Sequence, residues 1–394
     1  MNDIHRSREG YTVIIANNPM KSDVERNFLD NAIRGLLPLC KELYVIAGNF
    51  DRGYGERVHL IDIHEDEATR RASTLLRRIM KNLSAQSQMI FNLILVSSRS
   101  GIVFYDVGEY RNLIAILMGK LLGKTTLVYH HGGNKFLEGR ILYRNGAQRI
   151  IPYVQECMLR LCYRLVDHVL CQSPTIVEFG GLQAYRKKIF FLKHFVDIDR
   201  FVPGTPPTGK KNLIGYFGNL APKKGILNVV DSMPMILKQD KNMQLVLAGT
   251  GEMKSALLEL VKHKGLDESV KFLPWIPDES YPVRLRELKF FILPSAEEGV
   301  PATVLEAMAS GVIPIVTPVG GIPDIVNDGE TGFVIPDARP SSIATGVIRA
   351  LRNSNLDQIS KKGAEFVRNE YSLQAVAENY GEILASIQKA QIAE

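Results

Sequence analysis

The chain has 394 residues, of which 45% are hydrophobic and 23% are charged, and its formal net charge at pH 7 is +6. This composition is ordinary for a folded globular protein and excludes a disordered or collagen-like chain, while the length predicts two or three domains. Four cysteines without any CxxC pair exclude a disulfide framework and a zinc ribbon, and they favour a reducing, cytoplasmic compartment.

The first half of the chain alternates between strand-like and helix-like segments. Short apolar runs bounded by turn residues indicate buried strands, and apolar residues at helical spacing indicate helices. Apolar strands separated by helices are typical of a parallel sheet covered on both faces. The predicted strands are 11–17, 42–48, 101–107, 125–131, 168–174 and 189–195, and the predicted helices are 27–40 and 111–123.

Two further apolar runs, 89–96 and 113–119, are too short to span a bilayer, which needs about 20 residues, so we expect them to be buried. The first ten residues are polar, and they do not predict a secretion signal.

The segment 201–211 interrupts the alternation with three prolines and two glycines. These residues cannot continue a helix or lie in a central strand, which indicates a connection between domains. The alternation then restarts. The predicted strands are 212–219, 243–249, 269–275, 290–295, 312–318 and 332–336, and the predicted helices are 226–239, 253–265, 340–353 and 372–391.

The pattern therefore predicts an α/β protein made of two Rossmann-like, doubly wound domains. The first domain covers 1–202, a linker covers 203–211, and the second domain covers 212–371. The last segment, 372–394, is predicted to be a helix that either packs on the second domain or crosses back to the first.

The stretch 293–321 carries the strongest chemical signal. A strand ends there, a turn follows, and a helix is predicted to start near Pro301, because proline suits a first helical turn. Ligands of doubly wound sheets bind beyond the carboxyl ends of the strands, and the N–H groups at a helix start suit a phosphate. The candidate donor-binding residues at this start are Gly299, Val300, Pro301, Ala302 and Thr303.

Two carboxylates accompany this helix start, Glu298 in the turn and Glu306 eight positions later. Carboxylates accept hydrogen bonds from hydroxyl groups, so the pair suits a nucleotide sugar, with one for a ribose and one for the transferred sugar. The alternative is two surface glutamates that flank an ordinary strand–helix turn.

The segment 297–336 resembles the signature region of retaining glycosyltransferases of family 4, which have the GT-B fold. Their Glu-x7-Glu signature corresponds to Glu298 and Glu306, and later matching positions are Gly320, Gly321, Pro323, Asp324, Gly329, Gly332 and Phe333. The resemblance implies two domains that face each other across a cleft, with the donor mainly on the second domain and the acceptor on the first. It also implies that Glu306 holds the ribose and Glu298 the transferred sugar.

The segment 214–226 resembles the family's strand and glycine-rich turn. Lys224, beside a glycine at a helix start, is in the place where the family has a lysine for the diphosphate, and such a site suits an anion. After Gly218, Asn219 replaces the family's usual arginine. Either Lys223 or a first-domain residue supplies the missing cation, or the donor is held more weakly.

The segment 270–280 resembles the family segment whose backbone reads the nucleobase, which predicts the base near Trp275 and Ile276. The alternative places Trp275 in the core or at the rim. In the first domain, His130 and His131 end a predicted strand, and adjacent strand residues point to opposite faces, which disfavours a shared metal. The resemblance implies that His131 lines the cleft near the transferred sugar.

Two further features depart from the family. Lys193, His194 and Phe195 replace its usual P-N-G tripeptide, and segment 17–28 lacks its N-terminal glycine-rich loop. The replaced tripeptide argues against a ligand role at that position, and the missing loop predicts unusual acceptor recognition.

The charge is unevenly distributed between the halves. Residues 1–200 contain 28 basic and 20 acidic residues, a net charge of +8, whereas residues 201–394 have a net charge of −2. The stretches 70–83 and 139–168 mix arginines with apolar residues. They suit either core helices with an arginine-rich outer face, or a surface for an anionic membrane or acceptor. No nucleic-acid module is recognisable, so nucleic acid is not an expected partner.

The sequence thus predicts a retaining glycosyltransferase with a UDP- or GDP-sugar donor and a glycan or lipid-linked acceptor, in cell-surface polysaccharide or glycolipid synthesis. The proposed catalytic residues are His131, Glu298 and Lys224, and Gly218 and Asn219 line the donor site. No cofactor or metal is expected, because cationic protein groups take the metal's place. The protein would lie in the cytoplasm or peripherally on the inner face of the membrane. The alternatives are a sugar phosphorylase or nucleotide-sugar epimerase of the same fold, and a non-catalytic nucleotide-sugar-binding protein.

Overall fold

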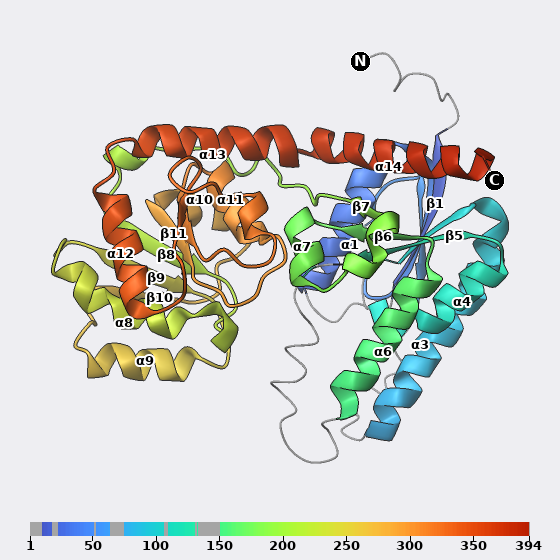
Figure 1. The fold of residues 1–394 in the computed structure, drawn as a ribbon, viewed down its shortest axis with the longest axis horizontal. Coiled ribbons are helices and arrows are strands. Elements are labelled where there is room, and N and C mark those ends of the chain that lie inside the picture. Colours follow the sequence, from blue (N-terminus) through green and yellow to red (C-terminus); the bar gives the residue numbers. More distant parts are fainter. Residues whose placement is uncertain are drawn as a thin grey trace. The chain divides into compact units, whose positions relative to one another are not determined.

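A computed structural model of the protein describes residues 10–17, 23–50, 53–63, 75–105, 109–130, 132 and 150–393 (Figure 1). The chain forms two compact units. The N-terminal unit contains Met1–Gln172, Gly181–Phe195 and Val376–Glu394, and the C-terminal unit contains Ser173–Gly180 and Val196–Ala375. Each unit is a parallel sheet covered by helices, so the predicted fold class is confirmed.

The sheet of the N-terminal unit has the strand order β3-β2-β1-β4-β5-β6-β7 within the described residues, and all of its pairs are parallel. Its central strands are apolar on both faces, as a sheet between two helical layers requires. The strands are β1 (Tyr11–Ala16), β2 (Cys40–Ala47), β3 (Val58–Asp62), β4 (Ile102–Tyr105), β5 (Thr125–His130), β6 (His168–Cys171) and β7 (Ile189–Phe191).

The helices of this unit lie on opposite faces of the sheet. The chain moves from β1 to β3 in one direction and from β3 to β7 in the other, and right-handed crossovers therefore place α1 on one face and α3, α4 and α6 on the other. Figure 1 shows these three helices together. Their bounds are α1 (Asp23–Leu36), α3 (Leu75–Val96), α4 (Leu113–Leu121) and α6 (Ile150–Leu165).

The last helix, α14 (Leu373–Ala393), completes the core of the N-terminal unit. Tyr380 and Ile383 join the apolar cluster that contains Leu29 and Ile33 of α1. The approach is close, because a Cβ atom on Gly35 would lie 2.6 Å from the Tyr380 ring. This part of the core of the N-terminal unit therefore contains side chains from both α1 and α14.

The sheet of the C-terminal unit has the order β10-β9-β8-β11-β12-β13 in the described chain, and it is also parallel. Its strands are β8 (Leu213–Phe217), β9 (Gln244–Ala248), β10 (Val270–Leu273), β11 (Phe290–Leu293), β12 (Ile313–Val316) and β13 (Phe333–Val334). Its helices are α7 (Pro174–Phe179), α8 (Ile226–Leu237), α9 (Lys254–His263), α10 (Tyr281–Glu287), α11 (Ala302–Ala309), α12 (Pro340–Leu351) and α13 (Leu356–Tyr371).

The chain passes between the units at other points than the predicted boundary at 202. Helix α7 belongs to the C-terminal unit, because Asp324 accepts a hydrogen bond from the Thr175 backbone N–H at 3.0 Å and a second one from its hydroxyl group. The segment 203–211, predicted as a linker, also lies within this unit, where Asp357 accepts hydrogen bonds from the backbone and side chain of Thr208.

The prediction that the run 89–96 is buried is wrong. The run forms the second half of α3, where Met89 and Leu93 are buried but Phe91 is 63% exposed and Leu95 is 61% exposed. A helix turns its side chains through a full circle every 3.6 residues, so a continuous apolar run on a surface helix must expose some of them. The sequence analysis also missed β3, a five-residue strand at the edge of the sheet.

Candidate active site

The candidate site lies in the C-terminal unit, at the carboxyl ends of the strands. The strand order reverses between β8 and β11. At such a switch point the loops that follow the two strands run in opposite directions, and ligands of doubly wound sheets bind in the crevice between them. Hydrogen bonds join these loops to each other: Ala296 N–H donates to the Lys223 carbonyl at 2.8 Å, and Gly321 N–H donates to the Gly299 carbonyl at 2.9 Å. The loops after β8, β11 and β12 therefore form one connected surface.

Two glycines allow this close approach. Gly225 has φ +70°, and a Cβ atom there would lie 2.4 Å from the Pro294 carbonyl oxygen. Gly320 has φ +58°, and its Cβ atom would lie 1.9 Å from the carbonyl oxygen of Glu298. Only a residue without a side chain fits either position without a shift of the backbone.

An ion pair spans the switch point. Lys224 Nζ, after β8, lies 2.6 Å from Glu298 Oε1, after β11. The Ser295 hydroxyl donates to the same carboxylate oxygen at 2.5 Å, and its own backbone carbonyl accepts a hydrogen bond from Thr317 at 2.5 Å. The Glu298 side chain is only 8% exposed and that of Lys224 is 20% exposed, so this pair is largely screened from water.

Helix α11 begins directly beside this pair. Its first residue is Ala302, and Pro301 occupies the N-cap, one position earlier than the first-turn place predicted for it. The Pro301 carbonyl accepts hydrogen bonds from the N–H groups of Val304 and Leu305. The N–H groups of Ala302 and Thr303 precede the helical hydrogen-bond ladder, and they are thus available to an anion.

Glu306, inside α11, belongs to a second cluster. The Tyr281 hydroxyl of α10 donates to Glu306 Oε2 at 3.0 Å. Burial raises the pKa of Glu306 to about 7, although the Tyr281 hydrogen bond and the positive charge of Arg200 partly oppose this rise. Arg200 itself is held 2.8 Å from Asp278. The carboxyl group can therefore change its charge near neutral pH.

The remaining donor-site candidates are dispersed along the sheet. The Asn219 carbonyl accepts a hydrogen bond from the Tyr216 hydroxyl at 2.6 Å, and its side chain is exposed. Trp275 is 61% exposed and, with Ile276, follows the edge strand β10, so it is not a core residue. The segment that carries both residues leads into α10, whose first residue is Tyr281.

In the N-terminal unit, the catalytic candidate His131 lies outside the described residues. Its neighbour His130 is buried, and its Nδ1 atom lies 2.7 Å from the Tyr163 hydroxyl. This pairing gives His130 a structural role. His194 is also buried, with Nδ1 3.5 Å from the Gln172 side-chain amide, and it lines a small pocket with Tyr129 and Tyr380.

The sequence analysis missed three residues that touch the predicted carboxylates or lie in their field: Tyr281, Arg200 and Ser295. Ser295 lies three positions before Glu298, a spacing at which a hydroxyl can reach a carboxylate within one turn. Tyr281 is 25 residues from Glu306, and no local pattern connects the two.

Part of the chain matches a known protein family. Residues 197–366 match the family model described as "Glycosyl transferases group 1". An uncharacterized glycosyltransferase of Methanocaldococcus jannaschii is 30% identical over 168 residues, which cover 42% of this chain and 43% of that protein. A putative colanic acid biosynthesis glycosyltransferase of Escherichia coli is 24% identical over 212 residues, 51% of this chain and 52% of that protein. The chain thus spans about half the length of the relatives that it matches.

Solved structures are similar over almost the whole chain. Sucrose-phosphate synthase from Thermosynechococcus elongatus has a TM-score of 0.75 and 16% identity, and the match covers 97% of this chain and 100% of that one. The Anabaena protein HepE, solved in complex with UDP and glucose, has a TM-score of 0.70 and 13% identity over 96% of this chain and 100% of that one. At these identities the likeness shows the shared GT-B fold.

Proposed function

We propose that this chain, whose residues 197–366 belong to the glycosyl transferases group 1 family and whose two domains have the GT-B fold, is a retaining glycosyltransferase that uses a nucleotide-diphosphate sugar. The presence of UDP in the HepE structure supports uridine diphosphate sugars as the first donors to test. The E. coli relative named for colanic acid biosynthesis supports a glycan or lipid-linked acceptor in polysaccharide synthesis.

The observation that carries this proposal is the Lys224–Glu298 pair beside the start of α11. When the bond between the sugar and the diphosphate breaks, negative charge grows on the leaving oxygen. Lys224 and the N–H groups of Ala302 and Thr303 at the start of α11 would stabilise that charge. Charged groups and N–H donors that are already in position when the charge develops usually make the largest single contribution to catalysis. These cationic and N–H groups would act without a metal ion or another cofactor.

The other residues would position the donor. Glu306 would accept hydrogen bonds from the ribose hydroxyls, and Glu298 would bind the transferred sugar once Lys224 turns to the diphosphate. The backbone near Trp275 and Ile276 would face the base, and His131 would lie by the reacting face of the sugar. The acceptor would bind the N-terminal unit.

A thermal-stability screen with UDP-, GDP- and ADP-sugars identifies the donor, because a ligand that binds only the folded state raises the melting temperature. We expect one nucleotide class to stabilise the protein and Glu306→Ala to lose that stabilisation. Unchanged donor affinity and turnover in Glu306→Ala would refute the assignment of the site.

With the donor known, nuclear magnetic resonance of the product reports the anomeric configuration, which should be that of the donor. Free nucleoside diphosphate should appear only when an acceptor is present. Release of diphosphate without an acceptor would instead indicate a hydrolase or an epimerase-type reaction, and donor binding without turnover across many acceptors would indicate a binding protein.

A further inference from the structure

The outer faces of α3, α4 and α6 expose an unusual amount of apolar surface. Of the sixteen large hydrophobic side chains that are exposed in the described part of the chain, ten lie on these three helices. Five of the ten are more than half exposed, namely Leu83 at 52%, Phe91 at 63%, Leu95 at 61%, Leu121 at 80% and Tyr153 at 53%. Single exposed hydrophobic residues are normal, but a concentration of this kind marks an interaction surface.

The exposed side chains form stripes along the helices. On α4, Ile114, Leu117 and Leu121 recur at i, i+3 and i+7, which places them on one side of the helix. On α6, Tyr153 and Leu161 lie two turns apart on the exposed side. The side of α4 that bears Ala115 and Ile116 is buried, so the exposed stripe faces away from the sheet.

The three helices form one layer. Helix α4 packs against α3 on one side and against α6 on the other, and all three cover the same face of the sheet. Their outward stripes therefore adjoin one another, and we call them together the outer helical face. Figure 1 shows α3, α4 and α6 side by side within the N-terminal unit.

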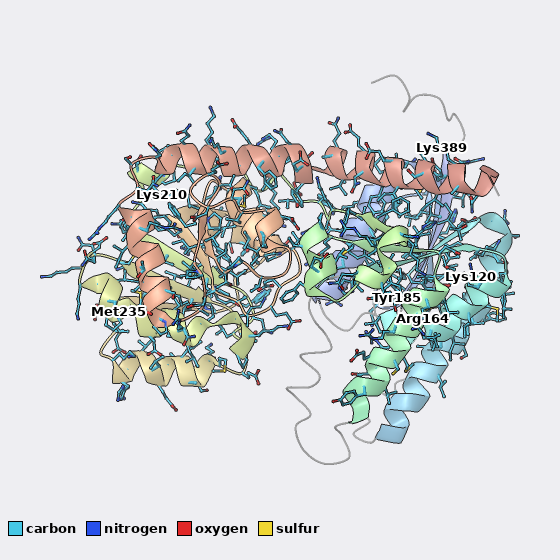
Figure 2. The ribbon with its side chains drawn as sticks, viewed as in Figure 1. Lys120, Arg164, Tyr185, Lys210, Met235 and Lys389 are labelled. Atoms are coloured by element: carbon cyan, nitrogen blue, oxygen red, sulfur yellow. The ribbon has the colours of Figure 1, made fainter. Side chains whose placement is uncertain are left out.

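Basic residues surround this face. Arg99 follows α3, Lys120 and Lys124 lie at the end of α4, and Arg160 and Arg164 lie on α6. Figure 2 labels Lys120 of α4 and Arg164 of α6, and both residues are exposed. By sequence, neither α3 nor α4 contains an acidic residue.

Two acidic residues, on α6 or just after it, form ion pairs with these cations. Glu156 lies 2.8 Å from Arg160, and Asp167 lies 2.5 Å from Lys120. Together with Arg99, Lys124 and Arg164, these helices and the residues that follow them carry more basic than acidic side chains among those that the structure describes.

We infer that the outer helical face docks the N-terminal unit on an anionic membrane surface. Apolar stripes with a basic rim are the features by which a surface helix enters the interface between headgroups and acyl chains. Among the described residues no helix is long and apolar enough to cross a bilayer, so the contact would be an interfacial one. A second copy of this chain fits less well, because two positively charged rims would repel each other.

Co-sedimentation with lipid vesicles tests this inference, and it needs neither a donor nor an acceptor, so its result does not depend on the proposed function. We expect the protein to bind vesicles of phosphatidylcholine mixed equally with phosphatidylglycerol and to bind pure phosphatidylcholine weakly. High salt should weaken the binding, because the Debye length falls from about 10 Å at 0.1 M to about 3 Å at 1 M.

Two variants separate the apolar contribution from the basic one. Phe91→Ser combined with Leu121→Ser should lower the partition coefficient at least about tenfold, because two side chains no longer enter the bilayer. Arg164→Gln should lower it about fivefold on the anionic vesicles only. Leu258→Ser on α9, where Leu258 is 46% exposed, is the matched control and should bind like the unmodified protein.

Three results would overturn the inference. The first is an absence of binding to the anionic vesicles by the unmodified protein, and the second is an equal loss of binding in Leu258→Ser. The third comes from analytical ultracentrifugation: a dimer that becomes a monomer in the Phe91→Ser, Leu121→Ser variant would show that a second copy covers this face. Melting temperatures equal to that of the unmodified protein would confirm that the variants fold.

Discussion

Lys224 and Glu298 are 74 residues apart in the chain, and their charged groups lie 2.6 Å apart across the point where the strand order reverses. If Lys224 binds the diphosphate, its ion pair with Glu298 must break when the donor binds. The pair would then keep both groups in place before the donor arrives, and it would release Glu298 for the sugar when the diphosphate binds.

Lys224→Met should lower the rate of sugar transfer by about 10²–10³, the usual loss when one group that stabilises a developing oxyanion is removed. It should also lower the free energy of unfolding by about 3 kcal/mol, because it leaves the Glu298 carboxylate unpaired at 8% exposure. Rate measurements and urea unfolding check the two effects separately.

The double variant Lys224→Met, Glu298→Gln should regain the lost stability but not the lost activity. Lys223→Met is the matched control, because Lys223 is the residue next to Lys224 and its side chain is exposed. A larger loss of activity in Lys223→Met than in Lys224→Met would transfer the diphosphate role to Lys223.

The raised pKa of Glu306 predicts a specific dependence of stability on pH. The pKa is about 7 in the folded protein and that of an ordinary glutamate in the unfolded chain, so between about pH 4.5 and 7 the folded state holds more protons. The contribution of Glu306 to stability therefore falls as the pH rises through this window. Glu306→Gln keeps an acceptor for Tyr281 and should be more stable than the unmodified protein at pH 8, by about 1–3 kcal/mol.

The same titration should affect donor binding. Calorimetry at pH 6 and pH 8 should show tighter binding at pH 8, because a carboxylate accepts hydrogen bonds from ribose hydroxyls better than a carboxylic acid does. In Glu306→Gln, donor affinity should be weaker and independent of pH. Equal pH dependence in the two proteins would contradict this role.

Gly320→Ala should damage the site and not only the fold. An added Cβ atom would lie 1.9 Å from the Glu298 carbonyl, so the loop that carries Glu298 must move. Gly329 provides a matched control, because it also has a positive φ, +74°, but no atom lies within 4 Å of its added Cβ. Gly329→Ala should cost about 1–2 kcal/mol of stability and leave donor affinity unchanged.

For Gly320→Ala, we expect a larger loss of stability and a weaker donor affinity, measured by thermal unfolding and calorimetry. Equal effects of the two substitutions would show that the contact with Glu298 does not matter for the site.

If Lys224 and the start of α11 neutralise the diphosphate, sugar transfer should need no divalent cation. Addition of EDTA should leave the rate unchanged. A rate that falls with EDTA and returns with Mg²⁺ would contradict the proposed role of these groups.

The sequence analysis predicted most strands of both sheets to within one or two residues, because a short continuous apolar run between two helices is typical of a buried parallel strand. It failed for the outer layer of the N-terminal unit. The run 89–96 is apolar except for Asn92, and apolarity alone does not say that only Met89 and Leu93 are fully buried.

The residues of the candidate site could be found individually from local motifs, but not their partners. Lys224 and Glu298 each follow a strand, and only the strand order makes those strands adjacent. Tyr281 contacts Glu306 because α10 returns towards α11, and a tyrosine at a helix start has no pattern that would reveal this contact.

The position of α14 also affects synthesis of the protein. Val376, Tyr380 and Ile387 belong to the core of the N-terminal unit, yet they leave the ribosome only after Val196–Ala375 of the C-terminal unit. Domains usually fold in the order of their synthesis. Here, the C-terminal unit can complete its sheet while the N-terminal one still exposes the apolar side of α1. A nascent chain at that stage is a substrate for chaperones, and a nonsense mutation near residue 372 would remove part of the domain that was translated first.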